Sequence, residues 1–558
     1  MEKSYNAVLL PQKKTIQVSC NSRIIDIIDS EDLNNTEKPV IAAKFNNIYT
    51  SLNSSIAIDG EIELVRLEGI NGMRIYRDSL IFLFEMAARK LFPGRRIVIG
   101  HSLGHGFILR FRDNGKDACN EDIEKINREM NDTVKKDLPV MPDKLSWKAA
   151  IDYFGKRAFP NTADLLNELN EPEVDIWKCG SFISLRQSTL VYRTGLLKTF
   201  ALENYQNGFL LRYPPTMTPG QLSPHENEPK LFSVYEEYKK WGEILGVSNV
   251  SQLNVLSRNR SKARDFIQTA EALHDRKIAE CTGIIRKHGG EIKAVMIAGP
   301  SSSGKTTFLK KLALSLRSAG FKPQLISLDN YYKNHDEVPK DEDGKPDFEA
   351  LEALDLDLFN KNLEDLFAGK ETEIPVFDFK NVGGRLEQGY KIRLEDDGIL
   401  LFEGIHGLNP DLAPHMDRNK SFRIYISPLT QLNLDDFNRI PTTDNRLIRR
   451  IVRDHQFRRY SAVKTLKIWP SVRRGEKKHI FPYRNTADIL FNSALDYEMA
   501  ILKIFAEPLL RTVKPDEEEY SEAQRLISLL KNFSPFPVEE VPEYSIIREF
   551  IGRSGFRY

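Results

Sequence analysis

The sequence predicts an α/β protein in which a parallel sheet forms the core of the larger, C-terminal part of the chain. The first observation is the apolar run from Ala294 to Ala298, which leads into a glycine-rich loop and then a helical pattern. The second is a pair of further apolar runs, Gln324 to Asp329 and Gly398 to Glu403, each ending in an acid. Ligands bind where the strands of parallel sheets end, so these acids predict a site at one edge.

The size and composition of the chain bound its class. A chain of 558 residues exceeds what one hydrophobic core usually serves, so two to four domains are expected. Lys and Arg together number 80 against 79 Asp and Glu, which argues against a protein whose main task is to coat nucleic acid. No stretch approaches the ~18 apolar residues of a membrane span, and the N-terminus lacks the pattern of a secretory signal. We therefore expect a cytoplasmic protein that contacts no membrane.

Proline marks the main domain boundary. Residues 213–229 contain five prolines and a glycine, which exclude a continuous helix or a central strand, and we predict a linker there. Residues 230–558 then form one domain with a helical lead-in. A weaker boundary near Leu67 separates a small mixed module, residues 1–66, from a second domain, residues 67–212.

Within these domains, the spacing of apolar residues predicts individual elements. Short strands are expected in the first module, and helices are expected in the second domain, before the glycine-rich loop, after it and near the C-terminus. The strands are Val40 to Phe45 and Ile62 to Leu67, and the helical stretches are Ser79 to Leu91, Leu231 to Lys287, Phe308 to Leu316 and Ala523 to Leu530.

The glycine-rich loop has the pattern G-x-x-x-x-G-K-T of a phosphate-binding P-loop. Glycines at its two fixed positions allow backbone turns that a Cβ would block, so that amide groups converge on nucleotide phosphates. The Lys305 ammonium is expected to reach the β- and γ-phosphates, and the Thr306 hydroxyl to coordinate a magnesium ion. A Gly/Ser turn that binds nothing is the alternative. The predicted nucleotide-binding residues are Gly299, Ser301, Ser302, Ser303, Gly304, Lys305, Thr306 and Thr307.

The acids that end the two further strands are candidates for the chemistry. Asp329 can accept the proton of an attacking hydroxyl and touch the magnesium shell through water, although such an Asp also serves as a helix N-cap or turn residue. Glu403 follows four apolar residues and is predicted to deliver a carboxylate to the magnesium, as a Walker-B acid does. The alternative for Glu403 is a structural pairing with an arginine.

A row of arginines follows at helical spacing. Residues at i, i+3, i+4 and i+7 share one face of a helix, here expected from Leu447 to Asp454, and four like charges there repel each other. We predict a helical lid that closes over ATP, because polyphosphate would neutralise these charges. A solvated basic face or an RNA contact is the alternative. The row comprises Arg446, Arg449, Arg450 and Arg453, with Arg458 and Arg459 beyond it.

In these motifs the chain resembles the uridine kinase and phosphoribulokinase family of P-loop kinases, from about Lys293 to Leu510. The resemblance implies ATP and Mg²⁺ as cofactors and phosphoryl transfer to the 5′-hydroxyl of a nucleoside such as uridine or cytidine. It implies Lys305, Asp329, Arg453 and Arg458 as catalytic residues, Thr306, Glu403 and Asp329 at the metal, and Asp329, Tyr332, Glu349, Phe377 and Arg385 at the nucleoside. The matching segments are Gly299 to Thr306, Leu328 to Lys333, Asp347 to Asp355, Ile374 to Phe379, Leu401 to Ile405, Arg449 to Asp454 and Ala487 to Ile489.

Departures from that family leave the acceptor open. Phe377 and Val382 stand where uridine kinases usually place a tyrosine and a histidine, so base-directed hydrogen-bonding groups are lost. Glu349 replaces the usual Asp with a longer arm. Because strong discrimination depends on buried polar groups that the wrong ligand leaves unpaired, such a site rejects other bases weakly. A sugar phosphate therefore stays open as an alternative acceptor.

The first 200 residues resemble a β-grasp TGS module followed by the α+β editing domain of threonyl-tRNA synthetases. The resemblance implies an RNA or regulatory ligand for this half. Phenylalanine and tryptophan can neither bind a metal nor move a proton, so we interpret the domain as a degenerate shell for binding. The matching segments are Ala42 to Asn47, Tyr76 to Ser79, Arg89 to Pro93 and Val98 to Phe107, and the editing positions are taken by Asp78, Phe82, Trp177 and Phe182.

Further alternatives remain at the level of the sequence. His101 and His105 are expected to be polar histidines of a glycine-rich turn, with a metal-binding pair as the alternative. The N-K-x-D sequence that selects guanine is absent. The main rival to a kinase is an RNA-associated sensor in which the P-loop half acts only as a nucleotide-dependent switch. We also expect a homo-oligomer.

Overall fold

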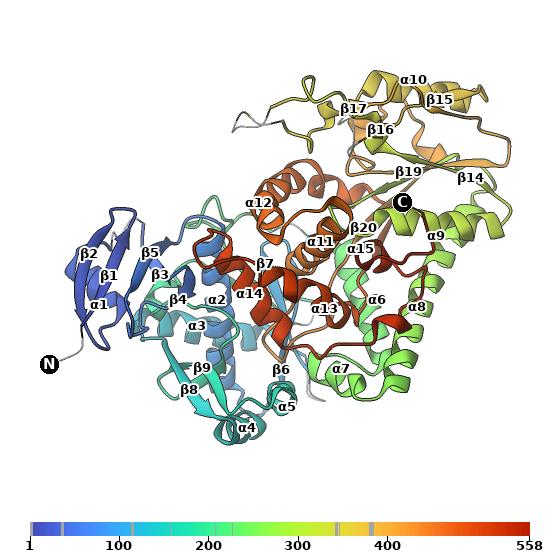
Figure 1. The fold of residues 1–558 in the computed structure, drawn as a ribbon. Helices are drawn as coiled ribbons and strands as arrows, with labels where there is room; N and C mark the ends of the chain where they lie inside the picture. The colour runs from blue at the N-terminus through green and yellow to red at the C-terminus, as the bar shows by residue number, and fades with distance from the viewer. Residues whose placement is uncertain are drawn as a thin grey trace.

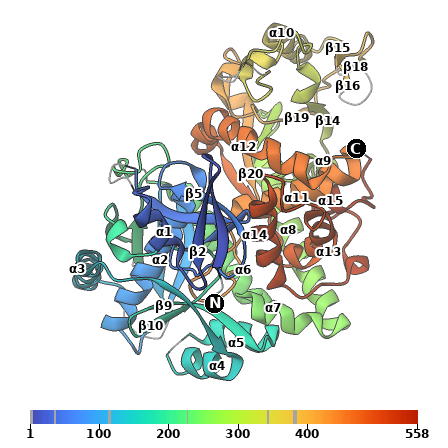
Figure 2. The same cartoon turned by 60° about the vertical axis from the view of Figure 1, so that its left-hand side comes forward.

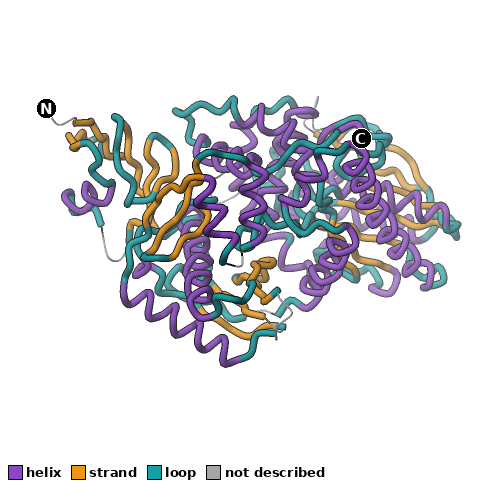
Figure 3. The backbone as a smooth tube through the Cα atoms, turned by 90° about the horizontal axis from the view of Figure 1, so that it is seen from below, coloured by secondary structure: helices purple, strands orange, loops and turns teal. Residues whose placement is uncertain are grey.

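The computed structural model confirms the α/β class. Strands form a sheet at the N-terminal end, two sheets in the part that follows and the C-terminal parallel sheet, with helices packed among them (Figures 1 and 3). Val382 lies outside the described residues. The structure describes residues 4–34, 38–112, 117–157, 159–206, 208–225, 227–340, 344, 346–378 and 384–557.

The N-terminal module is a five-stranded mixed sheet with one helix packed against it. Its strand order is β2-β1-β5-β3-β4, and β1 and β5 are parallel. Isoleucines of α1 enter the same core as apolar residues of β1, β3 and β5, which explains why the helix covers this sheet. The elements are β1 (Ser4–Leu10), β2 (Lys14–Ser19), α1 (Ile24–Ser30), β3 (Val40–Phe45), β4 (Ile48–Thr50) and β5 (Gly60–Arg66).

The next part of the chain is built around the long helix α2, which extends nine residues upstream of the predicted stretch. A four-stranded sheet of order β11-β12-β7-β6 and a three-stranded sheet of order β10-β9-β8 accompany it. The elements are α2 (Ile70–Leu91), β6 (Ile97–Leu103), β7 (Gly106–Phe111), α3 (Asn120–Lys136), β8 (Met141–Ser146), α4 (Trp147–Gly155), α5 (Pro160–Leu169), β9 (Glu173–Cys179), β10 (Phe182–Leu185), β11 (Ala201–Tyr205) and β12 (Gly208–Arg212).

The sequence predicts that His101 and His105 both lie in a glycine-rich turn, and the structure corrects this prediction for His101. His101 lies within strand β6 and stacks on Tyr235, with ring centroids 3.8 Å apart. Burial lowers the pKa of His101 to about 3, so its ring is neutral at physiological pH. His105 lies at the β6–β7 turn, edge-on to Tyr213. No group of three or more metal-ligating side chains occurs among the described residues, so this pair has no third ligand there.

The C-terminal half contains the predicted parallel sheet, with strand order β14-β19-β13-β20-β21. The helix after the glycine-rich loop, α9, packs on β14, β19 and β13. The register sets Ile297, Ser327 and Glu403 side by side, so the loop and both strand ends share one edge. The elements are β13 (Ala294–Ala298), α9 (Lys305–Ser318), β14 (Lys322–Ser327), α10 (Leu356–Phe367), β15 (Thr372–Ile374), β16 (Phe377–Asp378), β17 (Gly384–Arg385), β18 (Tyr390–Ile392), β19 (Gly398–Glu403), β20 (Ser421–Ser427) and β21 (Ile489–Asn492).

Helices connect the two halves of the molecule. Three of them precede the parallel sheet, and α14 near the C-terminus lies against the N-terminal module, where Ser521 donates a hydrogen bond to the Asn47 carbonyl (Figure 2). Within the described ranges, none of the helices has the length and apolar composition needed to span a bilayer. The elements are α6 (Pro229–Leu245), α7 (Val250–Ser257), α8 (Arg260–Lys287), α11 (Thr442–Arg458), α12 (Ala462–His479), α13 (Glu498–Leu510), α14 (Tyr520–Lys531) and α15 (Arg548–Ile551).

Candidate active site

The glycine-rich loop has no room for side chains at its fixed glycines. A Cβ on Gly299 would lie 2.1 Å from the carbonyl oxygen of Ile426. Gly304 has φ +83°, in the left-handed region, and a Cβ there would lie 2.5 Å from Ile546 Cγ2. Both positions therefore require glycine, and the loop leads directly into the first turn of α9, where helix amides can bind an anion.

The predicted lysine of the loop lies over the loop itself. Lys305 Nζ donates to the carbonyl oxygens of Gly299, at 3.0 Å, and Pro300, at 3.3 Å. Both acceptors are neutral, so the ammonium charge is not cancelled by an ion pair with them. Desolvation raises the pKa of Asp329 and of Glu403, and the charge of Lys305 opposes this shift at both acids, which places the lysine close to them.

Glu403 ends β19 beside the loop and is buried. Its Oε1 accepts hydrogen bonds from Thr306 Oγ1 and Ser327 Oγ, both at 3.3 Å. Burial raises the pKa of Glu403 to about 7, and the charge of Asp329 raises it further in the same direction. A hydroxyl and a carboxylate from adjacent elements thus converge on one point, as the oxygen ligands of a magnesium site do.

Asp329 follows β14 in a short 3₁₀ turn, Leu328–Tyr331. Its side chain is reached by solvent, but the surrounding protein atoms raise its pKa by desolvation. The positive charges of Lys305, Arg458 and Arg453 act in the opposite direction and favour the carboxylate. The structure therefore brings together Asp329, the loop lysine, two arginines and Glu403, which sequence analysis predicts for one site.

The predicted nucleoside-side residues adjoin this group. Tyr332 donates its hydroxyl to the Phe348 carbonyl oxygen at 2.8 Å, and its ring meets Phe377 edge-on. Arg385 forms an ion pair with Asp355 at 3.1 Å and donates to the Tyr332 carbonyl oxygen at 3.3 Å. Its guanidinium thus braces the turn that follows Asp329, and its contact with a nucleoside stays a prediction.

Glu349 is the nucleoside-side residue with the most unusual environment. It is half-buried, and its Oε2 has no hydrogen-bond partner among the described residues. Gly475 on α12 lies against it, since a Cβ on that glycine would be 2.5 Å from Glu349 Cβ. Burial raises the pKa of Glu349 to about 7, and the charge of Glu476 contributes in the same direction. An unsatisfied carboxylate beside the base is suited to accept hydrogen bonds from a ligand.

We expect Glu349→Gln to stabilise the ligand-free protein at pH 8 by about 1–3 kcal/mol. A carboxyl whose pKa is about 7 in the folded protein and 4.5 in the unfolded chain binds more protons when folded, so stability falls as pH rises from 4.5 to 7. The variant removes this decline. Urea unfolding at pH 5 and pH 8 measures it, with the exposed Glu352→Gln as control. A variant that is less stable than wild type at pH 8 would contradict the prediction.

The structure corrects the interpretation of the arginine row. Arg446 pairs with Glu476 and Arg449 pairs with Glu498, and all four side chains are almost fully buried. Their mutual repulsion is therefore relieved by carboxylates of this chain, not by polyphosphate. Arginines of this row also hydrogen-bond to the loop. Arg446 Nε donates to the Ser301 carbonyl oxygen at 3.0 Å, and Arg450 donates to Ser301 Oγ at 2.8 Å.

The outer arginines of α11 lie close enough to Asp329 to interact with it electrostatically. Arg453 and Arg458 lie 3.0 and 3.5 Å from Asp454, which is buried and shared between them. Both also lower the pKa of Asp329 through space. A single carboxylate does not neutralise this group of guanidinium charges, so positive charge remains beside the base. The role of a charge clamp thus stays a prediction for Arg453 and Arg458.

Two acids that contact the loop are not predicted by the sequence. The buried Glu476 accepts the Ser301 N–H at 3.0 Å, and Glu549 in α15 accepts both the Thr307 N–H, at 3.1 Å, and its hydroxyl, at 2.8 Å. Neither lies in a motif. The only signal for Glu476 is a glycine and a single acid within a run of basic residues, and Glu549 has no signal in the sequence.

The position of Glu549 predicts an effect on nucleotide binding. Its carboxylate occupies an amide of the first turn of α9, where a P-loop receives nucleotide phosphate. We expect Glu549→Gln to lower the KM for ATP about three- to tenfold, because a neutral amide is displaced by phosphate more easily than a like charge. Steady-state kinetics measure this, with Glu543→Gln in the same segment as control. An unchanged or raised KM would contradict it.

Comparison with known families agrees with this geometry. Residues 294–500 match the model of the Phosphoribulokinase / Uridine kinase family, which covers the loop, both acidic strand ends and α11. This part of the chain is thus similar to a family of P-loop kinases. Among solved structures, one titled "Structure of a Possible Uridine Kinase from Bacillus stearothermophilus" has 17% identity and covers 36% of this chain and 89% of its own, with a TM-score of 0.24. A score this low establishes no shared fold.

The N-terminal half has different relatives. Threonine–tRNA ligase of Carboxydothermus hydrogenoformans is 31% identical over 173 residues, and that of Caldanaerobacter subterraneus is 30% identical over 166 residues. These matches cover 31% and 30% of this chain. The chain spans only 27% and 26% of the length of these curated relatives. The predicted similarity of the N-terminal half to threonyl-tRNA synthetases is confirmed.

Proposed function

We propose that this chain transfers the γ-phosphoryl group of ATP to the 5′-hydroxyl of a nucleoside of the uridine or cytidine class, with magnesium. The observation that carries the proposal is the convergence of Asp329 and Glu403, from the ends of neighbouring strands, beside Lys305 and Thr306 of the loop. The charge of Asp329 raises the pKa of Glu403, and the charge of Lys305 favours the ionised form of both acids. Such interactions are expected where acids and a phosphate site lie close together.

The residues fit both ATP and magnesium. The fixed glycines let the loop pack closely against Ile426 and Ile546 and lead directly into the first turn of α9, whose Lys305 and Thr306 amides can bind phosphate. Thr306, Glu403 and Asp329 offer the hard oxygen atoms that magnesium prefers. When bound, magnesium would screen the charge of the phosphates, and ATP would supply the phosphoryl group.

The residues of this chain then divide the work. Asp329 accepts the proton of the acceptor hydroxyl as that oxygen attacks the γ-phosphorus. Lys305, Arg453 and Arg458 supply the positive charge that is needed where negative charge develops. Most of the remaining acceleration comes from positioning, which contributes about 7–11 kcal/mol in well-oriented reactions.

A panel of acceptors tests the substrate class. We would measure ADP release from ATP with uridine, cytidine, other nucleosides and sugar phosphates, scored by kcat/KM. The proposal expects uridine or cytidine to give the highest value. A sugar phosphate that exceeds every nucleoside would overturn the nucleoside assignment and favour the phosphoribulokinase-like alternative.

The similarity to threonine–tRNA ligases keeps one second candidate. In it, the N-terminal half binds RNA or a regulatory ligand and the kinase half acts as a nucleotide-dependent switch. Binding of tRNA with a steep salt dependence, together with ATP hydrolysis that no acceptor stimulates, would favour it. The degenerate editing positions support binding over hydrolysis: Phe82 and Trp177 are buried core residues, and Asp78 accepts a hydrogen bond from Ser188.

A further inference from the structure

A cavity of about 2380 Å³ lies between the N-terminal half and the kinase module. Helices α2, α12 and α14 and the start of α11 contribute to its walls. Of the described residues that line it, none belongs to the glycine-rich loop from 299 to 306. It is therefore a second cavity, separate from the crevice of the proposed kinase site.

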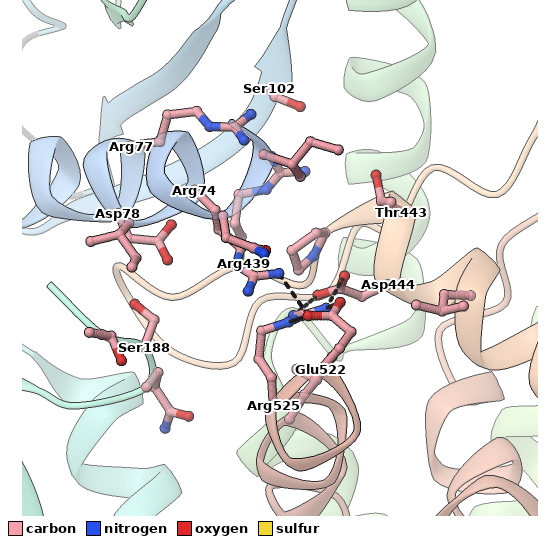
Figure 4. Close-up of a pocket in the computed structure, with 18 of the residues that line it drawn as sticks. Arg74, Arg77, Asp78, Ser102, Ser188, Arg439, Thr443, Asp444, Glu522 and Arg525 are labelled. Carbon is pink, nitrogen blue, oxygen red and sulfur yellow. Dashed lines mark hydrogen bonds and ion pairs between the residues drawn. The ribbon is translucent and has the colours of Figure 1, made fainter. Parts of the chain in front are cut away.

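On one wall of this cavity the charged side chains neutralise one another in ion pairs. Arg74 pairs with Glu522 at 2.9 Å, and Arg525 pairs with Asp444 at 2.6 Å and with Glu522 at 2.6 Å (Figure 4). The two arginines hold the pKa of the Glu522 carboxyl well below its usual range. Charges within this network match each other, so it offers little to a ligand.

Two guanidinium groups beside this network have no such partner. Among the described residues, no carboxylate forms an ion pair with Arg77 or Arg439. Arg77 donates its Nε to the Met73 carbonyl oxygen and lies over the Tyr213 ring, 5.3 Å from the centroid. Arg439 is half-buried, and desolvation by the surrounding protein lowers its pKa. A desolvated guanidinium without a counter-ion is costly, so an anion at this point would be strongly favoured.

One carboxylate, Asp78, shares the space with both arginines. It interacts electrostatically with Arg77 and Arg439, and it accepts a hydrogen bond from Ser188 (Figure 4). Asp444 also acts on Arg439 electrostatically, but both of its carboxylate oxygens accept hydrogen bonds from Arg525. Positive charge therefore remains in excess around these three side chains.

The start of α11 adds to that excess. Pro441, ahead of the helix, has no side chain that could cap it, and Thr442 and Thr443 both line the cavity. The N–H groups of Asp444 and Asn445 turn back to the Pro441 carbonyl oxygen. The amides of the two threonines have no helical partner, so the positive end of the helix faces the same space as Arg439.

We propose that this part of the cavity binds a small molecule through an oxyanion, a phosphate monoester or a carboxylate, held by Arg77, Arg439 and the first turn of α11. The planar fork of a guanidinium matches both kinds of oxyanion. The size of the cavity admits a ligand as large as a nucleotide.

The bound ligand also influences the kinase site, and this effect passes through α11. This one helix begins at the cavity, and within its first two turns Arg446 and Arg449 donate to the Ser301 and Ser302 carbonyl oxygens of the loop. Occupancy of the cavity therefore changes the affinity of the loop for ATP. This coupling rests on the proposed kinase function, whereas binding of the oxyanion does not.

Isothermal titration of the full chain tests the proposal with inorganic phosphate, uridine 5′-monophosphate and succinate as separate probes. A Lys305→Ala background removes binding at the P-loop. We expect saturable binding of at least one probe, with Kd raised about tenfold or more in Arg439→Gln and in Arg77→Gln. Arg186→Gln, on another wall of the same cavity, should stay within about twofold. Binding of inorganic phosphate and uridine 5′-monophosphate but not of succinate would assign the phosphate monoester class. Binding of succinate would assign the carboxylate class.

The following outcomes overturn the proposal. They are the absence of saturable binding for all three probes at millimolar concentration, and binding that neither arginine variant weakens. Arg439→Lys keeps the charge and loses the fork, so it provides an intermediate result if Arg439→Gln does not fold. In the wild type, a saturating probe should shift the Kd for a non-hydrolysable ATP analogue, and the shift should vanish in Arg439→Gln. Binding without any shift would overturn the coupling alone.

Discussion

Replacement of Asp329 by Asn should lower kcat for nucleoside phosphorylation by about 10²–10⁴-fold, the usual contribution of a general base. The KM values for ATP and nucleoside should change little, because the amide keeps the shape of the carboxylate. The physical reason is the position of Asp329: it ends the strand beside Glu403, and three cations favour its ionised form. Asparagine cannot accept the proton of the attacking hydroxyl.

Asp336→Asn serves as the matched control for that variant. Asp336 is exposed on the segment that follows the same turn and contacts neither the loop nor Glu403 among the described residues. Its kcat should equal that of wild type. A wild-type kcat in Asp329→Asn would remove the assignment of the base, and a large rise in KM with unchanged kcat would indicate a binding role instead.

Replacement of Lys305 by Met should lower kcat by about 10²–10³-fold, the cost of removing one preorganised stabiliser of transition-state charge. Among the described residues, the hydrogen bonds of Lys305 Nζ go to neutral carbonyl oxygens of its own loop, so its charge is available to phosphate. Methionine keeps the length of the side chain without the charge. Circular dichroism and urea unfolding should show an intact fold, since the lysine makes no ion pair.

Lys322→Met is the control for the loop lysine. Lys322 begins β14, at the opposite end of the strand from Ser327 and the site, and pairs with exposed acids there. Its kcat should stay within about twofold of wild type. Equal activity in Lys305→Met and wild type would show that the loop does not act on the transferring phosphoryl group.

The elements of the kinase half could be predicted from the sequence because their signals are local. The strand before the loop occupies Ala294–Ala298, as its apolar run indicates, and β19 ends at Glu403 as predicted. Strand ends in a parallel sheet meet at one edge, which is why Asp329 and Glu403 come together. The helix α11 also forms, although it extends from Thr442 to Arg458 and is longer than expected.

The parts that could not be predicted depend on contacts between distant residues. The spacing of the arginines on α11 shows that they share a face, but it does not show that Glu476 and Glu498 neutralise them from α12 and α13. The contact of Glu549 with Thr307 joins residues 242 positions apart. Similarly, His101 is a strand residue whose ring stacks on Tyr235 of α6, which no local pattern indicates.

The identity of the products tests the central claim most directly. We would incubate the protein with ATP, magnesium and uridine and follow the phosphorus by ³¹P NMR and mass spectrometry. The proposed chemistry predicts uridine 5′-monophosphate and ADP in equal amounts, with product forming at least about 10²-fold more slowly in Lys305→Met. ADP accompanied only by inorganic phosphate, with the uridine unchanged, would contradict phosphoryl transfer to a nucleoside and favour a nucleotide-dependent switch.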